Sequence, residues 1–313
     1  MAGPRQYVSA PSFTQLPHGL LSTLAGVIRT PSDDHWKGGV TYETLCGAGG
    51  STYDECLVVS GTGSGEVVEP AEPPAKSATA SLLTRGATPF TVFAEVDCST
   101  PGFWDRAERS VRDALAQSEE YQVERAFWTG VAGGGGVVYP HLAADTEYED
   151  AYGALLQTAV SNIGEAAELD VVEALGRVEG ELAECYNGVG VIHVPRTLAP
   201  AFAAENLIIP SGPGYVTHNG NIVVFGAGYT GSFPDGSTNP NAMFIYATGA
   251  MFIYRSDVRV FTRRESLDRG TNTLKMIAER TYVVGWDCCH IGVKVTLGGV
   301  GSGSAGDAAE YVV

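Results

Sequence analysis

Positive charge is scarce in this sequence. Of its 313 residues, 36 are Asp or Glu and 19 are Lys or Arg, including only four lysines, and the net charge is −17. Nucleic-acid binding needs basic side chains that displace counterions from phosphates, so the shortage argues against such a surface, and against an anionic membrane as a partner. No apolar run is long enough for a membrane span, and no apolar signal segment follows Arg5. We therefore expect a soluble, cytoplasmic chain.

Motifs of the common enzyme classes are missing as well. The sequence has no GxSxG, Walker A or HExxH pattern, and its six histidines are scattered. His193 lies in an apolar, strand-like run, where we expect a hydrogen-bonded core histidine. The acid pair Glu119 and Glu120 and the acidic run at 147–150 lie in predicted helices, and we expect both on solvated faces. The sequence thus predicts no catalytic residue, no cofactor and no metal site.

One glycine pattern is similar to a nucleotide-binding motif. Gly226-Ala-Gly228-Tyr-Thr-Gly231 matches GxGxxG and follows a strand-like run. A dinucleotide site also needs a helix that begins there, so that the amides at its N-terminus meet the pyrophosphate. The residues that follow include Pro234 and Gly236, which favour a turn. We therefore expect a glycine-rich loop between two strands and no nucleotide site.

The six cysteines form no CxxC pair and show no zinc-ligand spacing with histidine. Cys46 and Cys56 flank a glycine-rich turn and could approach each other, but we do not expect a disulfide there in a reducing cytosol. Cys288 and Cys289 lie in an apolar, strand-like run that directs neighbouring side chains to opposite faces. We expect both to be buried as small hydrophobic side chains rather than to be reactive.

The clearest predicted element is a long helix that ends at Gly130. Ser99 or Thr100 can cap its N-terminus, and Pro101 lies near its first turn. About 27 residues at a rise of ~1.5 Å would form a rod of about 40 Å, which is long for a globular domain. Apolar residues recur at helical spacing at positions 103, 107, 111, 114, 115, 123 and 127.

The remaining elements mix helices and strands without a strict βαβ rhythm, so an α+β fold fits better than a doubly wound one. Further helices are predicted over residues 20–28, 145–167, 170–185 and 196–205. Strands are predicted over residues 53–59, 90–96, 189–194, 222–225, 244–247, 251–254, 258–262, 273–286 and 290–296. Residues 60–76 are rich in Gly, Pro and Ser and indicate an exposed loop, and residues 298–306 indicate a Gly/Ser linker.

The acidic excess is uneven along the chain, because residues 251–313 are close to neutral. A solvated face is one interpretation of the basic residues there, and a contact with an acidic surface on a neighbouring copy is the other. The basic cluster consists of Arg255, Arg259, Arg263, Arg264, Arg269, Lys275 and Arg280.

The order of these elements is similar to that of a known family. It runs from an extended arm through a strand-flanked loop, a long helix and a helix-rich segment to a strand-rich return. Ile245-Tyr-Ala-Thr-Gly249, Ser256-Asp-Val-Arg-Val-Phe261 and the pair of segments 273–286 and 290–295 resemble the end of a tailed-bacteriophage major capsid protein, particularly of phages that infect actinobacteria. Residues 173–184 followed by Gly190-Val-Ile-His-Val-Pro195 resemble the central domain of that family.

The resemblance implies the Hong Kong ninety-seven-type capsid fold and a structural subunit that is not an enzyme. Such subunits assemble, in the bacterial cytoplasm, into hexamers and pentamers of an icosahedral shell around double-stranded DNA, with a portal and separate scaffolding or decoration proteins as partners. The implied parts are an N-terminal arm (1–36), an extended loop with flanking strands (37–97), the spine helix of the peripheral domain (98–131), the axial domain (132–256), and the peripheral return with the C-terminal tail (257–313).

The resemblance also suggests which residues contact neighbouring subunits. Some relatives crosslink a loop lysine to a neighbour's asparagine, but with four lysines in the chain we do not expect this chemistry. The predicted contact residues are Lys76, Arg85, Arg255, Arg259, Arg263, Arg264 and Arg269.

Three alternatives remain open at this point. An encapsulin-type nanocompartment has the same fold but holds protein cargo, and the extended N-terminal segment favours a phage capsid over it. An enzyme on an α+β scaffold is disfavoured because catalytic motifs are missing. A tail-tube protein is disfavoured by the long helix.

Overall fold

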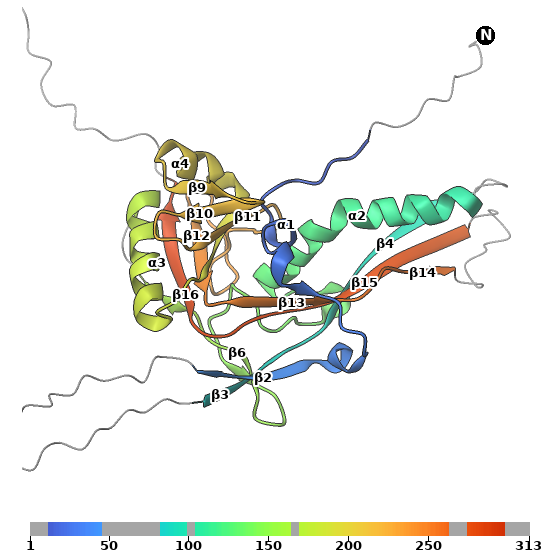
Figure 1. The fold of residues 1–313 in the computed structure, drawn as a ribbon, viewed down its shortest axis with the longest axis horizontal. Coiled ribbons are helices and arrows are strands. Elements are labelled where there is room, and N and C mark those ends of the chain that lie inside the picture. The colour runs from blue at the N-terminus through green and yellow to red at the C-terminus, as the bar shows by residue number, and fades with distance from the viewer. Residues whose placement is uncertain (1–11, 46–81, 99–103, 164–168, 263–273, 298–313) are drawn as a thin grey trace, which may run out of the picture.

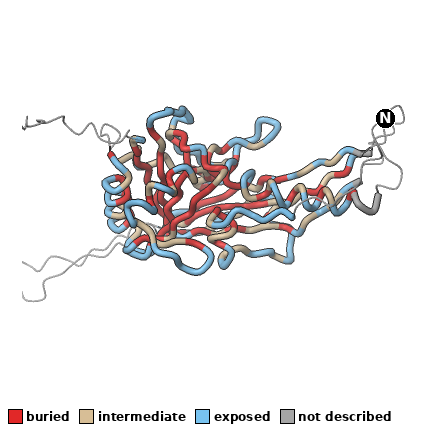
Figure 2. Tube along the Cα trace, turned by 90° about the horizontal axis from the view of Figure 1, so that it is seen from above, coloured by how far each residue is buried: buried red, intermediate tan, exposed pale blue. Residues whose placement is uncertain are grey.

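The computed structural model describes residues 12–45, 82–98, 104–163, 169–262 and 274–297, which form three sheets and a long helix, α2 (Trp104–Thr129) (Figure 1). The molecule has two unequal halves. Helix α2 and one sheet form a narrow part, which we call the extension. A second sheet and its helices form a thicker part, which we call the body, and buried residues are densest there (Figure 2).

The sheet of the extension is built around its longest strand. β15 pairs antiparallel with β4 along one side and with β14 and β13 along the other, and β1 pairs parallel with β13. The strands predicted over 90–96, 251–254, 258–262 and 273–286 are thereby confirmed. The five strands are β1 (Ile28–Arg29), β4 (Phe90–Cys98), β13 (Met251–Arg255), β14 (Arg259–Thr262) and β15 (Leu274–Trp286).

Helix α2 covers one face of this sheet because its apolar residues recur every three to four positions. It ends at Gly130, whose φ of 70° lies in the left-handed region that favours glycine at helix ends. The predicted long helix and its end are thus confirmed. The buried apolar positions of the helix include Ala107, Val111, Leu115, Val123 and Phe127.

Glu119 corrects one expectation about this helix. It was expected on a solvated face, but it is 6% exposed and faces β15. Arg280 Nη1 donates to Glu119 Oε1 at 2.9 Å, and the Tyr282 hydroxyl donates to the same oxygen. The expectation was wrong because helical spacing alone does not reveal a basic partner 161 residues further along the chain. That partner is what makes burial of the carboxylate tolerable.

The body contains the largest sheet, with strand order β7-β16-β12-β8-β11-β10-β9. All five residues of β8 are buried, as expected for a central strand that is covered on both faces. The predicted strands over 189–194, 222–225, 244–247 and 290–296 are confirmed. The seven strands are β7 (Ser161–Asn162), β8 (Val191–Pro195), β9 (Ile208–Ser211), β10 (Gly214–Thr217), β11 (Ile222–Gly226), β12 (Ala242–Thr248) and β16 (His290–Thr296).

Helices cover both faces of this sheet. On one face, α3 (Val171–Cys185), η4 (Arg196–Leu198) and α4 (Ala199–Ala204) pack against alternate residues of β8, β11, β12 and β16. On the other face, the C-terminal end of α2 packs against residues of β8, β11 and β12 that point the opposite way. Asp170 caps α3, since its Oδ1 accepts from Val172 N at 2.8 Å. The predicted helices over 170–185 and 196–205 are confirmed.

The third sheet has the order β2-β3-β6-β5 and lies beside the line where the two halves meet (Figure 1). β2 and β3 form an antiparallel ladder from the pair Val40 and Ala87 to the pair Leu45 and Leu82. Residues 46–81, which include the predicted strand over 53–59 and the loop over 60–76, lie outside the described residues. The strands are β2 (Val40–Leu45), β3 (Leu82–Ala87), β5 (Tyr148–Glu149) and β6 (Leu155–Gln157).

The helix predicted over 145–167 is wrong. Its described part, up to residue 163, forms the hairpin of β5 and β6 and the short strand β7. Asp150 Oδ1 accepts from Tyr152 N at 2.8 Å and from Ala154 N at 2.9 Å, and Gly153 adopts a φ of 80°. This local turn competes with the helix, and the pairing of β6 with β3 adds a partner that the segment cannot reveal by itself.

Short helical segments complete the described chain: α1 (Leu20–Thr23), η1 (Ala25–Val27), η2 (His35–Gly38) and η3 (Gly133–Gly135). The first two fall in the segment that was predicted as a short helix. Among the residues that the structure describes, no helix is both long enough and apolar enough to cross a membrane.

Candidate functional site

Polar groups from distant parts of the described chain meet at two junctions. The arm junction joins the N-terminal segment to α2 and to the body. The turn junction lies where the chain passes from β15 of the extension to β16 of the body (Figure 1). In the described ranges, no group of three or more His, Cys, Asp or Glu side chains is placed to hold a metal ion.

Two carboxylates of α2 bind the N-terminal segment at the arm junction. Glu124 Oε1 accepts from Leu20 N at 2.8 Å, and Glu120 Oε1 accepts from Ser22 N at 2.9 Å. These amides lie in the first turn of α1, so the side chains of another helix satisfy donors that a capping residue usually satisfies. Gly19 allows this approach, since an added Cβ would lie 2.5 Å from Glu120 Oε1.

Glu124 also binds the glycine loop that matched the nucleotide motif. Its Oε2 accepts from Gly228 N at 2.8 Å. A Cβ on Gly228 would lie 2.2 Å from Tyr121 O of α2, so only glycine lets the loop approach the helix this closely. The loop connects β11 and β12 with no helix between them, which confirms the predicted glycine-rich loop between strands. The glycine therefore serves packing between the two halves.

Glu124 is fully buried, and burial raises its pKa to about 7, while the amides of Gly228 and Leu20 lower it. Burial also raises the pKa of the neighbouring Tyr229 hydroxyl, and the charge of Glu124 adds to that effect. A carboxyl whose pKa is near 7 thus joins the N-terminal segment, α2 and the body.

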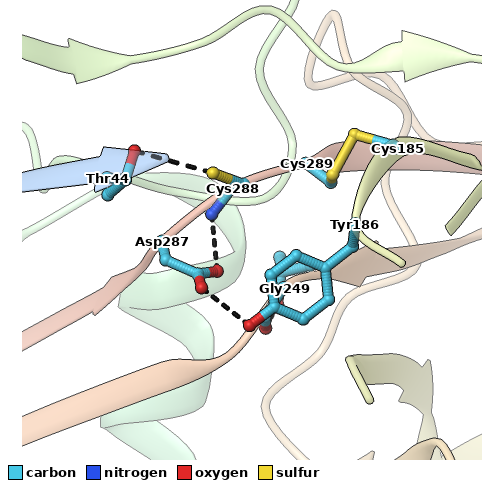
Figure 3. Close-up of a disulfide and its surroundings, with 8 residues drawn as sticks. Thr44, Cys185, Tyr186, Gly249, Asp287, Cys288 and Cys289 are labelled. Atoms are coloured by element: carbon cyan, nitrogen blue, oxygen red, sulfur yellow. Dashed lines mark hydrogen bonds between the residues drawn. A yellow bond between two sulfur atoms is a disulfide. The ribbon is translucent and has the colours of Figure 1, made fainter. Parts of the chain in front are cut away.

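The turn junction is built from residues 287–289, and three other segments bind it (Figure 3). The Tyr186 hydroxyl, just after α3, donates to Asp287 Oδ2 at 2.7 Å. Gly249 N, between β12 and β13, donates to Cys288 O at 2.7 Å. The sulfur of Cys288 lies 3.6 Å from Thr44 Oγ1 of β2. The end of α3, the connection between β12 and β13, and strand β2 of the third sheet therefore meet at one turn.

A disulfide closes this junction. Cys289 is bonded to Cys185, the last residue of α3, with 6.0 Å between the Cα atoms and 104 residues between the two positions (Figure 3). Cys288 and Cys289 are both buried, as predicted, but the expectation that the two thiols are unreactive is wrong, because both are disulfide-bonded. Cys289 has a φ of 60° in the turn, so strand alternation does not set its direction. It points to α3, where a second cysteine lies.

Arg85, one of the predicted contact residues, faces inward. It is 7% exposed in β3, and burial lowers the pKa of its guanidinium, while Tyr42 and Asp287 oppose that shift. The Tyr42 hydroxyl donates to Trp286 O at 2.6 Å, next to the turn junction. Arg85 therefore lies between the base of the third sheet and the turn.

The other predicted contact residues lie on or beyond the extension. Arg255 is half-buried at the end of β13. Arg259 is exposed on β14, with its Nη2 3.7 Å from Asp34 Oδ2. Lys76, Arg263, Arg264 and Arg269 lie outside the described residues, as do Cys46 and Cys56.

His193 is a core residue, as predicted. It is fully buried, with Nδ1 3.0 Å from the Tyr229 hydroxyl and Nε2 3.2 Å from Thr248 Oγ1. Burial lowers its pKa to about 3, so the ring is neutral at physiological pH. Both ring nitrogens therefore take part in packing the body, away from solvent.

Sequence reasoning missed Glu124 and the bond between Cys185 and Cys289. For Glu124 a signal was present, because it lies between Val123 and Phe127 on the apolar side of the helix and one turn after Glu120. A carboxylate in that position needs donors from another segment. For the cysteine pair no local signal exists, because 104 residues separate the two positions.

Comparison with solved structures finds capsids of related shape. The capsid of a native GTA particle has a TM-score of 0.53 and 11% identity, over 94% of this chain and 95% of that chain. The capsid of an empty GTA particle has a TM-score of 0.50 and 13% identity, over 92% of this chain and 100% of that chain. A structure of Mycobacterium phage Ogopogo has a TM-score of 0.47 and 15% identity, over 94% of this chain and 97% of that chain.

No family model and no curated protein matches the sequence. The two GTA capsids nevertheless align with nearly the whole chain, so both halves and the third sheet belong to one known arrangement. The α+β class and the fold predicted from the order of the elements are confirmed: the chain has the Hong Kong ninety-seven-type capsid fold.

Proposed function

We propose that this chain is a major capsid protein of a tailed bacteriophage, a structural subunit that forms hexamers and pentamers of an icosahedral shell around double-stranded DNA. The observation that carries the proposal is the likeness to a GTA capsid over 94% of this chain and 95% of that one. The alignment leaves no large part of either chain unmatched, which supports the proposal.

Exposed apolar side chains at the base of the third sheet support this function. Leu45 is 65% exposed and Leu82 is 64% exposed, at the ends of β2 and β3. Removal of such surface from water contributes roughly 25 cal/mol per Å², so these positions favour coverage by a partner. We propose that residues 46–81 form the extended loop and that this loop, with its base, lies on a neighbouring copy.

The division of the chain into parts is also a proposal. Residues 1–36 would form the arm and 37–97 the loop with its flanking strands. Residues 98–131 and 257–313 would form the peripheral domain, and 132–256 the axial domain. The extension, with α2, β14 and β15, and the body, with α3 and β8 to β12, support this division. β13 pairs with β15, which favours a boundary shortly before residue 251.

We propose that Arg255 and Arg259, with Lys76, Arg263, Arg264 and Arg269, contact an acidic surface on a neighbouring copy. The ion pair of Arg259 with Asp34 is exposed and long, so it contributes little and can exchange for another partner. The β5–β6 hairpin offers one acidic surface, since Glu147 and Glu149 are exposed. Arg85, which is buried, would support the loop base from inside its own subunit.

The charge of the chain suits the proposed contents. A net charge of −17 gives a wall that does not bind phosphates tightly, so packaged DNA can move during filling and release. The subunit would assemble in the bacterial cytoplasm and remain in the virion, with a portal and separate scaffolding or decoration proteins as partners. An encapsulin-type shell with protein cargo is the alternative that the test below separates.

The test is expression of the full chain, alone and with its neighbouring genes, followed by negative-stain microscopy and nuclease treatment. We expect closed shells, and nuclease-protected DNA inside those that are made during infection. Shells that hold protein and no DNA would support the encapsulin alternative, and monomers under all conditions would contradict both.

A deletion of residues 61–74 tests the loop within the same experiment. We expect it to abolish shells, because the loop would no longer cover a neighbour, while the far-ultraviolet circular dichroism of the subunit stays unchanged. Replacement of the same residues by a Gly/Ser segment of equal length is the matched control, because it keeps the length of the connection between β2 and β3. Shells formed by the deletion variant would refute the loop assignment.

A further inference from the structure

The disulfide lies at one of the connections between the two halves of the molecule, the turn between β15 and β16. Its partners are the end of α3, on the body, and the turn between β15 and β16 (Figure 3). Cys289 is 7% exposed, and Cys185 is half-buried at the last position of its helix. The bond therefore fixes a body helix to the turn by which the chain leaves the extension.

Non-covalent contacts already place the two cysteines next to each other. Asp170 caps the start of α3, and the buried residues Val178 and Leu182 pack the helix onto the sheet of the body. At its other end, the Tyr186 hydroxyl donates to Asp287 Oδ2 at 2.7 Å, two residues before Cys289. These contacts would place the two sulfur atoms next to each other without the bond.

We infer that Cys185 and Cys289 form an oxidation-dependent staple, which closes after the chain has folded with two free thiols. In this step the two thiols lose two electrons and two protons as the S–S bond forms. A low-molecular-weight disulfide accepts them, its own S–S bond breaks, and it leaves as two thiols. A reducing cytosol keeps the two thiols free, and an oxidising exterior lets the bond form. That the bond forms only after the particle leaves the cell rests on the proposed function.

The staple has a mechanical consequence for the subunit. A crosslink between positions 104 residues apart restricts the unfolded chain over a long loop, which is the case in which a disulfide stabilises most. It also holds the end of α3 to the turn by a covalent bond. We expect the closed staple to raise the thermal unfolding midpoint by about 5 °C for a chain of this size.

The first experiment follows the oxidation state. Cells that express the full chain are lysed in N-ethylmaleimide, and a second sample is purified and incubated with glutathione disulfide before alkylation. Peptide mapping should find Cys185 and Cys289 alkylated in the first sample and joined in the second. A joined pair in the first sample would overturn the timing, and an unjoined pair in the second would overturn the staple itself.

The second experiment measures the effect of the bond on the unassembled subunit, so that it does not depend on shell formation. Wild type and the Cys185→Ser/Cys289→Ser variant are both incubated with glutathione disulfide, and the thermal unfolding midpoint of the variant should then lie about 5 °C below that of the wild type. Dithiothreitol should lower the midpoint of the variant less than that of the wild type. Tyr186→Phe is the control, because it removes the neighbouring hydrogen bond and should keep the full response to dithiothreitol. Equal responses of the wild type and the double variant would refute the staple, whatever the outcome for the shell.

Discussion

The body and the extension differ in how completely their sheets are covered. In the body, helices pack on both faces, and every residue of β8 is buried. In the extension, α2 covers one face, and η2 and the third sheet cover only the part of the other face near β13, where Val283 is buried. The rest of that face is exposed, with Phe93 59% exposed and the ion pair of Lys275 with Glu95 in solvent. The central strands of the body are therefore covered on both faces, whereas part of the sheet of the extension is covered on one face only.

The two halves also use different interactions to hold their helices. In the body, α3 is held by apolar packing, by the hydrogen bonds that Asn219 and Asn221 donate to Glu179, and by its disulfide. The covered face of the extension includes a charged group, Glu119, held by Arg280 and Tyr282. A buried ion pair fixes one geometry but contributes little net stability, although removal of one partner is costly.

Removal of that charged contact tests the difference most directly. Glu119→Ala leaves Arg280 without its partner between helix and sheet, and we expect the free energy of unfolding to fall by about 3 kcal/mol, at the low end of the range for buried pairs because the Arg280 side chain is 19% exposed. Urea unfolding of the full chain measures the loss. Glu108→Ala, on the same helix, removes the exposed pair with Arg112 and should cost less than ~0.5 kcal/mol. Equal losses would show that the extension does not depend on its buried pair.

The contact between the halves is tested by two glycines of the body. Gly228→Ala places a Cβ 2.2 Å from Tyr121 O, so the loop must move away from α2, and we expect a loss of about 2 kcal/mol. Gly180→Ala, on α3, meets nothing within 4 Å and should raise stability by roughly 0.5–1 kcal/mol, because alanine favours the helix. Thermal unfolding distinguishes the opposite signs, and a neutral Gly228→Ala would mean that the halves are less closely packed than the structure indicates.

The sequence predicted the parts of both halves whose structure depends on local pattern. The long helix follows from the spacing of Val111, Leu115 and Val123, and α3 follows from its cap at Asp170. The strands in the C-terminal part of the chain, from β8 to β16, follow from apolar runs between turns. The resemblance to capsid proteins supplied the arrangement of these elements, which periodicity alone does not determine.

The parts that could not be predicted depend on partners distant in sequence. Residues 145–163 do not form the predicted helix, because β6 pairs with β3, which lies about 70 residues earlier in the chain. The Glu119 carboxylate is buried because β15 supplies Arg280, and Cys289 is bonded because a turn with a φ of 60° directs it to α3. Glu124 could have been noticed as a carboxylate on an apolar helix face, but its donors, Leu20 and Gly228, come from two other parts of the chain.

The smallest expected effect concerns the pH dependence of the arm junction. Burial raises the pKa of Glu124 to about 7, above its ordinary value of 4.5, so the folded chain keeps a proton in the window between these values that the unfolded chain has lost. By linkage, Glu124 therefore lowers the free energy of unfolding as pH rises through this window, by about 1 kcal/mol between pH 6 and pH 8. Above pH 8 its charged form is present in both states and the effect is constant.

Glu124→Gln removes the titration and keeps the size of the side chain. Its amide cannot accept from both Leu20 N and Gly228 N, so we expect the variant to be less stable than the wild type at every pH. The diagnostic quantity is the slope: urea unfolding at pH 6, 7 and 8 should show a smaller fall for the variant than for the wild type. Parallel profiles would mean that Glu124 keeps its ordinary pKa, and then the arm would be held equally well on both sides of neutral pH. A steeper profile in the wild type would place the pH-sensitive contact of this chain between its two halves, where the arm, α2 and the glycine loop meet.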